Sequence, residues 1–226
     1  MHNCLVGSEM CIRDSAGIYI SYWIGDIASD NCIAGGESVT DTEGLHQIEY
    51  MTHGAVNEEC RSVMRYNYCG IARCNFILEP KQNNVEFASK EVILAEAKFL
   101  RAFYYFELVK FFGAIPLVID ERLGVQQVSE LSRTPKEQVY AQIESDLQDA
   151  VATLSWKSES SHSGIKGRVD KGAALGLLGK VYLYQEKWSL AAGTLDQIIN
   201  SNYYALTPDY TDIFLKESEN LSLIHI

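Results

Sequence analysis

Carboxylates within one long apolar segment are the first residues to weigh for chemistry, because glycosidases use carboxylate pairs. Glu91, Glu96 and Glu107 all fall in a stretch with helical spacing. Catalytic pairs of this kind are defined by their separation in space, which sequence spacing does not supply. The chain also lacks HExxH, GxSxG and a glycine-rich phosphate loop. We therefore expect a solvated or interhelical role for these carboxylates, no catalytic residues and no enzyme.

Histidine and cysteine do not occur at the spacing of metal ligands. None of the six cysteines forms CxxC, and no nearby histidine completes a zinc pattern. We expect no metal and no cofactor, and we interpret the cysteines as small apolar core residues. A disulfide that involves Cys32 remains an open alternative. We place His46, His53 and His162 in exposed loops.

A flat aromatic ring beside hydrogen-bonding side chains is the pattern that favours sugar binding, because the ring contacts the C–H face of a pyranose. The region 31–53 contains His46, Gln47 and Tyr50. These are the candidate ligand-binding residues, with Tyr50 as the stacking ring. The alternative, which the sequence favours, makes Tyr50 a core residue at the start of the next helix. The aromatic run from Phe103 to Phe106 is expected in the core.

Most segments around the candidate residues have apolar residues at helical spacing. Apolar residues recur at helical spacing over 16–30, 57–78 and 91–112. Gly113 is a suitable residue to end the last of these helices. The stretch 31–52, rich in Gly, Ser, Thr and Asp, is predicted to be a long loop. A capping box with Thr134 as N-cap and Glu137 at N3 predicts another helix, which ends near Leu154.

The clearest unit is a pair of helices over 170–185 and 188–200. The two-residue turn between them requires an antiparallel arrangement. The pair fits the 34-residue tetratricopeptide template, with Gly179 and Ala191 at its small positions and Tyr182 at an aromatic one. Tyr203 stands where the template has proline. The predicted fold is therefore all-α, built from tetratricopeptide-like antiparallel helix pairs with long irregular loops.

Charge and hydropathy exclude some classes of function. The formal net charge is −11, whereas a nucleic-acid binder needs a cationic surface. No window approaches the ~18 consecutive apolar residues of a membrane-spanning helix. A neutral ligand such as a glycan is compatible with both observations.

Both ends of the chain differ from the sequence between them. Residues 1–15 and the closing LSLIHI, 221–226, join no periodic pattern and resemble translated sequencing-adapter sequence. We expect both to be non-native. The domain then covers 16–220, and we expect it to be incomplete, with its C-terminal half missing.

Several runs, in order along 20–220, resemble the SusD/RagB family. They are RYNYCGIARCNFIL, with the Ile71 and Asn75 pattern; AEAKFLRAFYYFELVKFFGAIPLV; SRTPKEQVYAQIESDLQDAV; GRVDKGAALGLLGKVYLYQEKWSLAAGTLDQIINSNYYAL; and DYTDIFLKESEN. The resemblance implies a SusD-like α-α superhelix. It also implies that loops near the early helices, where Tyr50 lies, contribute to a glycan surface.

The resemblance further implies a surface-exposed outer-membrane lipoprotein that binds oligosaccharide without cleaving it. Its partner would be a SusC-like, TonB-dependent outer-membrane transporter. The membrane contact would be an N-terminal lipid anchor, which this sequence lacks, and no nucleic acid would be bound. Two alternatives are a cytoplasmic tetratricopeptide-type adaptor and an all-α enzyme such as a helical-barrel glycosidase.

Overall fold

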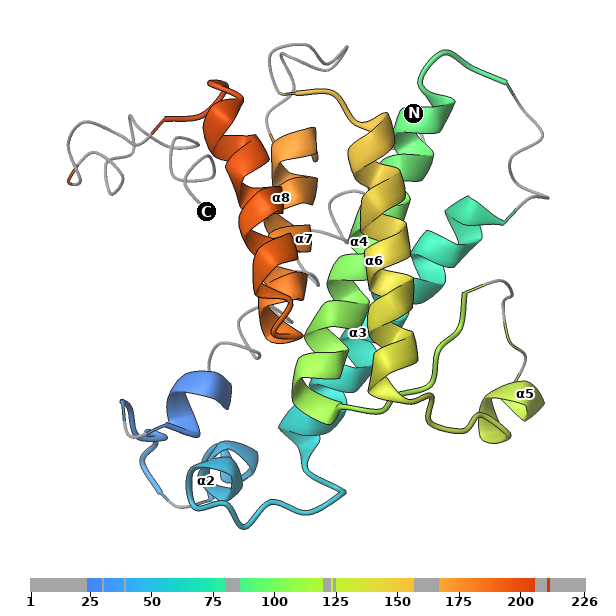
Figure 1. Cartoon of the computed structure of the whole chain (residues 1–226). Coiled ribbons are helices and arrows are strands. Elements are labelled where there is room, and N and C mark those ends of the chain that lie inside the picture. Colours follow the sequence, from blue (N-terminus) through green and yellow to red (C-terminus); the bar gives the residue numbers. More distant parts are fainter. Residues whose placement is uncertain are drawn as a thin grey trace, which may run out of the picture. The chain divides into compact units, whose positions relative to one another are not determined.

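The computed structural model describes residues 24–29, 31–38, 40–79, 86–119, 123, 125–156, 167–205 and 211. Its helices are α2 (Glu43–Glu49), α3 (Glu58–Leu78), α4 (Lys90–Phe112), α5 (Val125–Ser129), α6 (Lys136–Thr153), α7 (Lys171–Tyr184) and α8 (Trp188–Asn200) (Figure 1). Within the described residues the only β-pairing is an isolated bridge between Ile115 and Thr134. The all-α prediction is confirmed.

The chain divides into two compact units, Met1–Gly70 and Ile71–Ile226, with the boundary inside α3. In the first unit, α2 forms within the range predicted to be a loop, so that prediction was wrong in part. Leu45 and Ile48 are three residues apart and both are buried. Their shared apolar face stabilises a short helix that the polar composition of 31–52 concealed.

Asn57 joins α2 to the start of α3. Its side-chain Oδ1 accepts hydrogen bonds from the backbone N–H groups of Glu59 and Cys60, at 3.0 and 3.1 Å. This is N-cap geometry, and it satisfies two of the backbone donors that a helix start leaves unpaired. The Asn57 amide also donates to the carbonyl of Gly44 at 2.9 Å. The predicted helix 57–78 is confirmed, with Asn57 as its cap.

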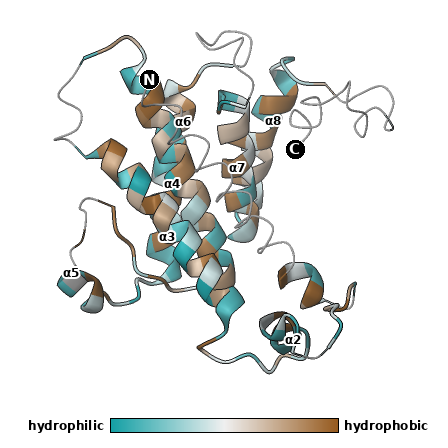
Figure 2. Ribbon diagram, turned by 180° about the vertical axis from the view of Figure 1, so that it is seen from behind, coloured by the Kyte–Doolittle hydropathy of each residue, from teal (hydrophilic) through white to brown (hydrophobic). Residues whose placement is uncertain are grey.

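In the second unit the helices pack in chain order: α4 on α6, α6 on α7 and α7 on α8. Figure 2 shows hydrophobic residues recurring along α4 and α7. Small residues allow the close approach, since Ala95, Ala150 and Ala174 form one buried cluster with Leu154. The predicted core aromatics are confirmed: Tyr104, Tyr105 and Phe106 are buried and Phe103 is partly buried.

A buried ion pair fastens α4 to α6. The Arg101 guanidinium donates to both carboxylate oxygens of Asp146, at 2.8 and 2.7 Å. It also donates to the Asn75 side chain and to the carbonyl of Ile119, both at 3.0 Å. Burial alone would lower the pKa of Arg101, but its hydrogen bonds to Asp146 and that residue's charge hold the pKa above its ordinary value. The guanidinium therefore remains charged in the core.

The segment after α4 is held by a tyrosine. Gly113 ends α4 with φ of 65°, a left-handed value that favours glycine. The Tyr105 hydroxyl then accepts from the backbone N–H of Val118 at 2.8 Å and donates to the carbonyl of Val118 at 2.7 Å. One phenol thus satisfies both backbone groups of Val118, as a neighbouring strand would.

The predicted capping box before α6 is wrong. Pro135, one residue later than expected, occupies the N-cap position, and no side chain caps the helix. The backbone N–H of Thr134 instead donates to the carbonyl of Ile115 at 2.9 Å. This bridge between two segments of the chain holds the backbone of Thr134 in an extended conformation. The helix α6 begins after it. The predicted end near Leu154 is confirmed, since Leu154 is the C-cap.

The helix pair α7–α8 confirms the tetratricopeptide-like prediction. Asp170 caps α7 by accepting from the backbone N–H of Ala173 at 2.8 Å. A Cβ added at Gly179 would lie 2.7 Å from a methyl of Leu195, so glycine is what permits the close approach of the two helices. Tyr182 is buried, and its hydroxyl accepts from Gln148 of α6 at 3.2 Å.

Tyr203 replaces the template's proline and has a packing role of its own. Its ring stacks on Trp156, with centroids 5.2 Å apart and planes 21° apart. Tyr204 meets the same Trp156 ring edge-on at 6.2 Å. The end of α6 and the end of α8 are therefore joined by aromatic contacts.

The core interpretation of the cysteines holds for only one of the four described. Cys74 is buried, Cys60 is partly buried, and Cys32 and Cys69 are exposed; none of these four described cysteines is assigned to a disulfide. No helix of the described residues has the length and apolar character to span a bilayer. Several expectations concern residues outside the described ranges: the two ends, 1–15 and 221–226, the first part of the helix 16–30, and the loop position of His162.

Candidate functional site

The three predicted ligand-binding residues come together on α2. His46 and Gln47 lie in the helix, and Tyr50 is its C-cap, so the expected exposed loop is a helix at this point. The Tyr50 side chain is 67% exposed. The alternative that placed Tyr50 in the core is therefore wrong. Its position at the end of α2, with Leu45 and Ile48 on the buried face, turns the ring outward.

His46 supports the Tyr50 ring from behind. The two rings are nearly parallel, with an interplanar angle of 11° and centroids 6.4 Å apart. His46 Nδ1 lies 3.5 Å from Glu49 Oε2, and the same Glu49 oxygen accepts from the backbone N–H of Ala34 at 3.1 Å. The His46 side chain is only 18% exposed. The imidazole is therefore largely covered by its surroundings.

Gln47 is held by its neighbours at both ends of its amide. Its Nε2 donates to Glu43 at 3.1 Å, and its Oε1 accepts from Asn57 at 3.1 Å. These bonds use one donor and one acceptor position of the amide, so Gln47 also fixes α2 against the start of α3. Within the described residues these two are the hydrogen bonds of its side chain.

Exposed residues that follow Tyr50 extend the surface beyond what the sequence indicated. Thr52 and His53 are exposed, as are Met51 at 62% and Val56 at 89%. The run therefore places a ring, apolar side chains and hydrogen-bonding groups in one exposed stretch. Sugar recognition requires such a mixture of a flat apolar face with polar groups. The sequence signal that could have added Thr52 and His53 to the candidate site was their position just after Tyr50.

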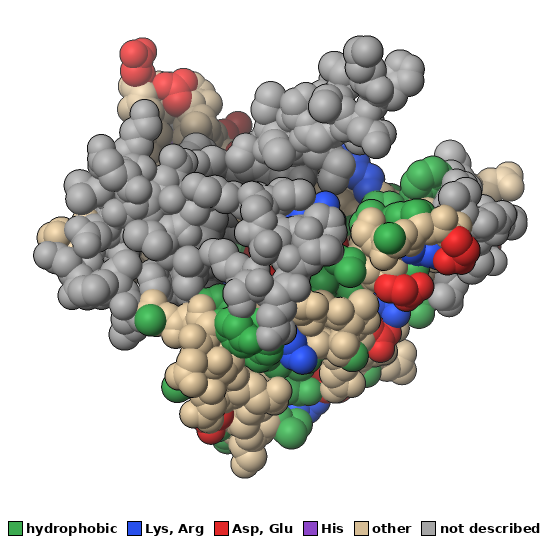
Figure 3. Space-filling view, turned by 90° about the horizontal axis from the view of Figure 1, so that it is seen from above, with side chains coloured by type: hydrophobic (Ala, Val, Ile, Leu, Met, Phe, Trp, Pro, Cys, Tyr) green, Lys and Arg blue, Asp and Glu red, His purple; other side chains and the backbone are tan. Residues whose placement is uncertain are grey.

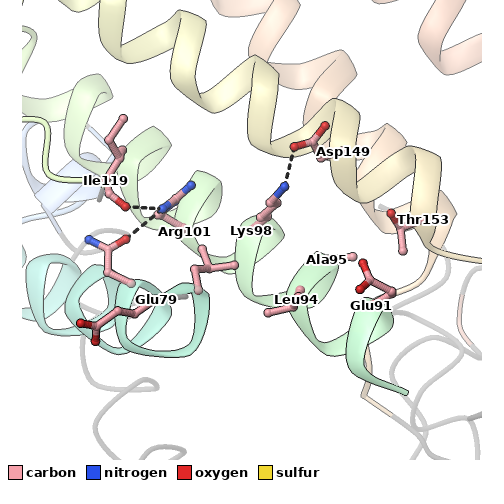
Figure 4. Close-up of a pocket in the computed structure, with 11 residues that line it drawn as sticks. Glu79, Glu91, Leu94, Ala95, Lys98, Arg101, Ile119, Asp149 and Thr153 are labelled. Carbon is pink, nitrogen blue, oxygen red and sulfur yellow. Dashed lines mark hydrogen bonds and ion pairs between the residues drawn. The ribbon is translucent and has the colours of Figure 1, made fainter. Parts of the chain in front are cut away.

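A cavity of about 440 Å³ with a mixed polar and apolar lining lies in the second unit (Figure 4). The ends of α3 and α6 and the first half of α4 form its walls. Lys98 and Asp149 meet across it at 2.6 Å, and Arg101 lines its inner side. Its most prominent charged groups are thus engaged with each other. Two further carboxylates, Glu79 and Glu91, also line the cavity.

The predicted solvated or interhelical role fits two of the three carboxylates of α4, since Glu107 pairs within its own helix. Glu96 pairs with Arg168, and Glu107 pairs with Lys110 at 2.6 Å. Glu91 is exposed at the edge of the cavity (Figure 4). Figure 3 shows Lys and Arg side chains beside Asp and Glu side chains on one face of the molecule. In the part of the chain described, no cluster of three potential metal ligands occurs.

Comparison with known families gives a match over most of the chain. A SusD-like family model, described as starch-binding and associating with the outer membrane, matches residues 20–183. This range includes α2 to α6 and most of α7. The candidate residues on α2 fall inside it.

Individual relatives agree with the family match. A SusD-like protein of Formosa agariphila is 28% identical over 155 residues, which are 67% of this chain and 28% of that protein. A SusD-like protein of Bacteroides ovatus is 31% identical over 159 residues, 65% of this chain and 28% of that protein. A solved structure, a laminarin-binding SusD-like protein, is 30% identical with a TM-score of 0.73 and matches 92% of this chain and 49% of that one. The matched regions therefore span a quarter to a half of these relatives.

Proposed function

Because the chain belongs to the SusD/RagB family, we propose that it is a glycan-binding component of an outer-membrane nutrient-uptake system. The family description as starch-binding supports a carbohydrate ligand. The similar solved structure named for laminarin binding supports a glucan in particular. The protein holds an oligosaccharide for uptake and does not cleave it.

The observation that carries the site is the exposed Tyr50 ring supported by His46. Tyr50 is 67% exposed, yet its ring is nearly parallel to that of His46, at 11°. A ring that is exposed and already oriented loses little conformational freedom when a sugar stacks on it. Tyr50 supplies the stacking face, His46 orients it, and Gln47 fixes α2 and offers one N–H.

The test is a binding titration of the full chain with laminarin and with soluble starch. Tyr50→Ala should weaken binding by roughly 2- to 10-fold, the loss expected for an aromatic contact of about 0.5–1.5 kcal/mol. Phe87→Ala is the matched control, since Phe87 is an aromatic residue 49% exposed elsewhere on the chain. Equal binding by wild type and Tyr50→Ala would remove Tyr50 from the site.

A separate assay of released reducing sugar tests whether the protein cleaves its ligand. Prolonged incubation of the chain with either glucan should release no reducing sugar above a buffer control. The paired charges of the cavity, Lys98 with Asp149 and Arg101 with Asp146, support this expectation. Time-dependent release of reducing ends, proportional to protein concentration, would contradict it.

We propose a SusC-like, TonB-dependent transporter as the partner and the outer cell surface as the location, with attachment through an N-terminal lipid anchor. Membership of the family supports all three. An antibody against this chain should recover the transporter barrel from detergent extracts of native outer membranes. It should also label intact cells. Labelling only after lysis would contradict the surface location.

A further inference from the structure

The turn between α7 and α8 exposes two large aromatic side chains. Tyr184, the last residue of α7, is 53% exposed, and Trp188, the first residue of α8, is 62% exposed. Four peptide links separate them, so their Cα atoms lie within about 15 Å. Hydrogen bonds from the backbone N–H groups of Gln185 and Lys187 to the carbonyl of Tyr182, at 3.1 and 3.0 Å, fix the turn. The two rings are therefore presented by a rigid segment.

Tyr184 is anchored without being covered. Its ring meets that of Phe106 edge-on, with centroids 5.1 Å apart and planes at 79°, and Phe106 is 1% exposed. Tyr140 of α6 lies close by, since burial and the neighbouring Tyr184 raise the pKa of its phenol. The phenol oxygens of both tyrosines are groups that can form hydrogen bonds.

A polar group stands beside the rings. Glu144 Oε1 accepts from the Gln185 amide at 2.6 Å and from Lys187 at 2.5 Å. Within the described residues both bonds end on Oε1, which leaves Oε2 to accept from another donor. The Lys187 side chain is 39% exposed and has further N–H groups to offer. A donor in the turn, Lys187, and an acceptor on α6, Glu144, are thus held together next to the turn that carries the exposed rings.

From this arrangement we infer that the α7–α8 turn is a second oligosaccharide subsite. Trp188 and Tyr184 would stack on the sugar rings. Glu144 and Lys187 would form hydrogen bonds with the sugar hydroxyls. The ligand class is a pyranose oligosaccharide whose C–H faces are apolar, as in a glucan. The inference rests on the proposed function and extends it, because the subsite lies on helices other than the one that carries Tyr50.

A glycan fits this surface better than a protein partner does. The carboxylate and ammonium groups are half-buried and already held in place, so they can bind hydroxyls with little reorganisation. Large aromatic residues exposed together on a protein surface point to a binding surface. The mixture of rings with pre-oriented polar groups is the composition that sugar recognition needs.

The test measures the affinity of full-length Trp188→Ala, Trp188→Phe and Phe87→Ala for laminarin and soluble starch, with thermal unfolding recorded for each. Trp188→Ala should bind the preferred glucan roughly 5-fold more weakly. Trp188→Phe should retain most of the affinity, and Phe87→Ala should match wild type. Because Trp188 is largely exposed, all variants should unfold at the wild-type temperature.

The outcomes separate this inference from the proposed function. Wild-type affinity in Trp188→Ala, together with weakened binding in Tyr50→Ala, would overturn the second subsite and leave the proposed function in place. No binding of any glucan by the wild type would overturn both. Wild-type glucan affinity combined with lost recovery of the transporter would also overturn the subsite and identify the turn as a protein interface.

Discussion

Replacing Arg101 by methionine tests the central packing of the second unit. The Arg101 and Asp146 side chains are 7% and 3% exposed, and their closest N–O distance is 2.7 Å. Methionine keeps the length of the side chain but removes the charge and the donors to Asp146, Asn75 and Ile119. Asp146 then keeps a buried charge, and within the described residues it keeps only the hydrogen bond from Gln142 at 3.0 Å.

The expected loss follows from the charge that is left behind. Removing one partner of a buried ion pair costs about 3–5 kcal/mol, a large share of the 5–15 kcal/mol that typically stabilises a domain. With a urea m-value of roughly 2 kcal/mol/M, the unfolding midpoint should fall by about 2 M. Circular dichroism at the helical band during urea titration measures this midpoint.

Two further variants make the test discriminating. Lys98→Met removes the surface pair with Asp149, whose side chains are 33% and 54% exposed, and should lower stability by less than about 1 kcal/mol. Arg101→Met with Asp146→Leu should recover much of the loss, because no unpaired charge remains. Equal midpoints for Arg101→Met and Lys98→Met would refute the reasoning.

Three other predictions follow from single contacts. Burial raises the pKa of Tyr105 to about 12. The stability that the protonated phenol contributes is therefore present below pH 10 and is lost, by about 2–3 kcal/mol, as pH rises from 10 toward 12. Between pH 8 and 11.5 the urea midpoint should fall less steeply in Tyr105→Phe than in the wild type. Gly179→Val should destabilise the protein by roughly 1–3 kcal/mol, because the added side chain meets Leu195. Gly193→Ala, whose Cβ would have no atom within 4 Å, should instead stabilise the protein by up to about 1 kcal/mol. Thermal unfolding measures both changes. Asp170→Ala removes the α7 cap and should lower stability by about 0.5–2 kcal/mol, and no change in melting temperature would exclude Asp170 as the cap.

The elements predicted correctly are those whose signal is local and periodic. The helix expected over 91–112 is α4, Lys90–Phe112, and the range expected for α8 is the one observed. Gly179 was predicted from a template and is explained by its contact with Leu195. In each case the residues that determine the element lie within it or in its immediate neighbour.

The predictions that failed depended on contacts between distant residues. Thr134 has the right side chain for a cap, but its backbone pairs with Ile115. The helix α2 has only 7 residues, with two buried apolar positions, and it is also held by the bond from Asn57 to the carbonyl of Gly44. The α7–α8 turn was not singled out as a site, because the position of Glu144 beside Lys187 arises only when α6 packs on α7.

The hydroxyl of Tyr105 also constrains the order in which this part of the chain can fold. Both backbone groups of Val118 bond to that hydroxyl, and its carbonyl also accepts from Asn75 of α3 at 2.8 Å, so its full set of native hydrogen bonds requires both α3 and α4. The Tyr105 contact spans only 13 residues and closes a short loop, which favours rapid formation. These contacts favour an order in which the extended segment docks on a formed α4, before the bridge from Ile115 to Thr134 fixes the segment that leads into α6.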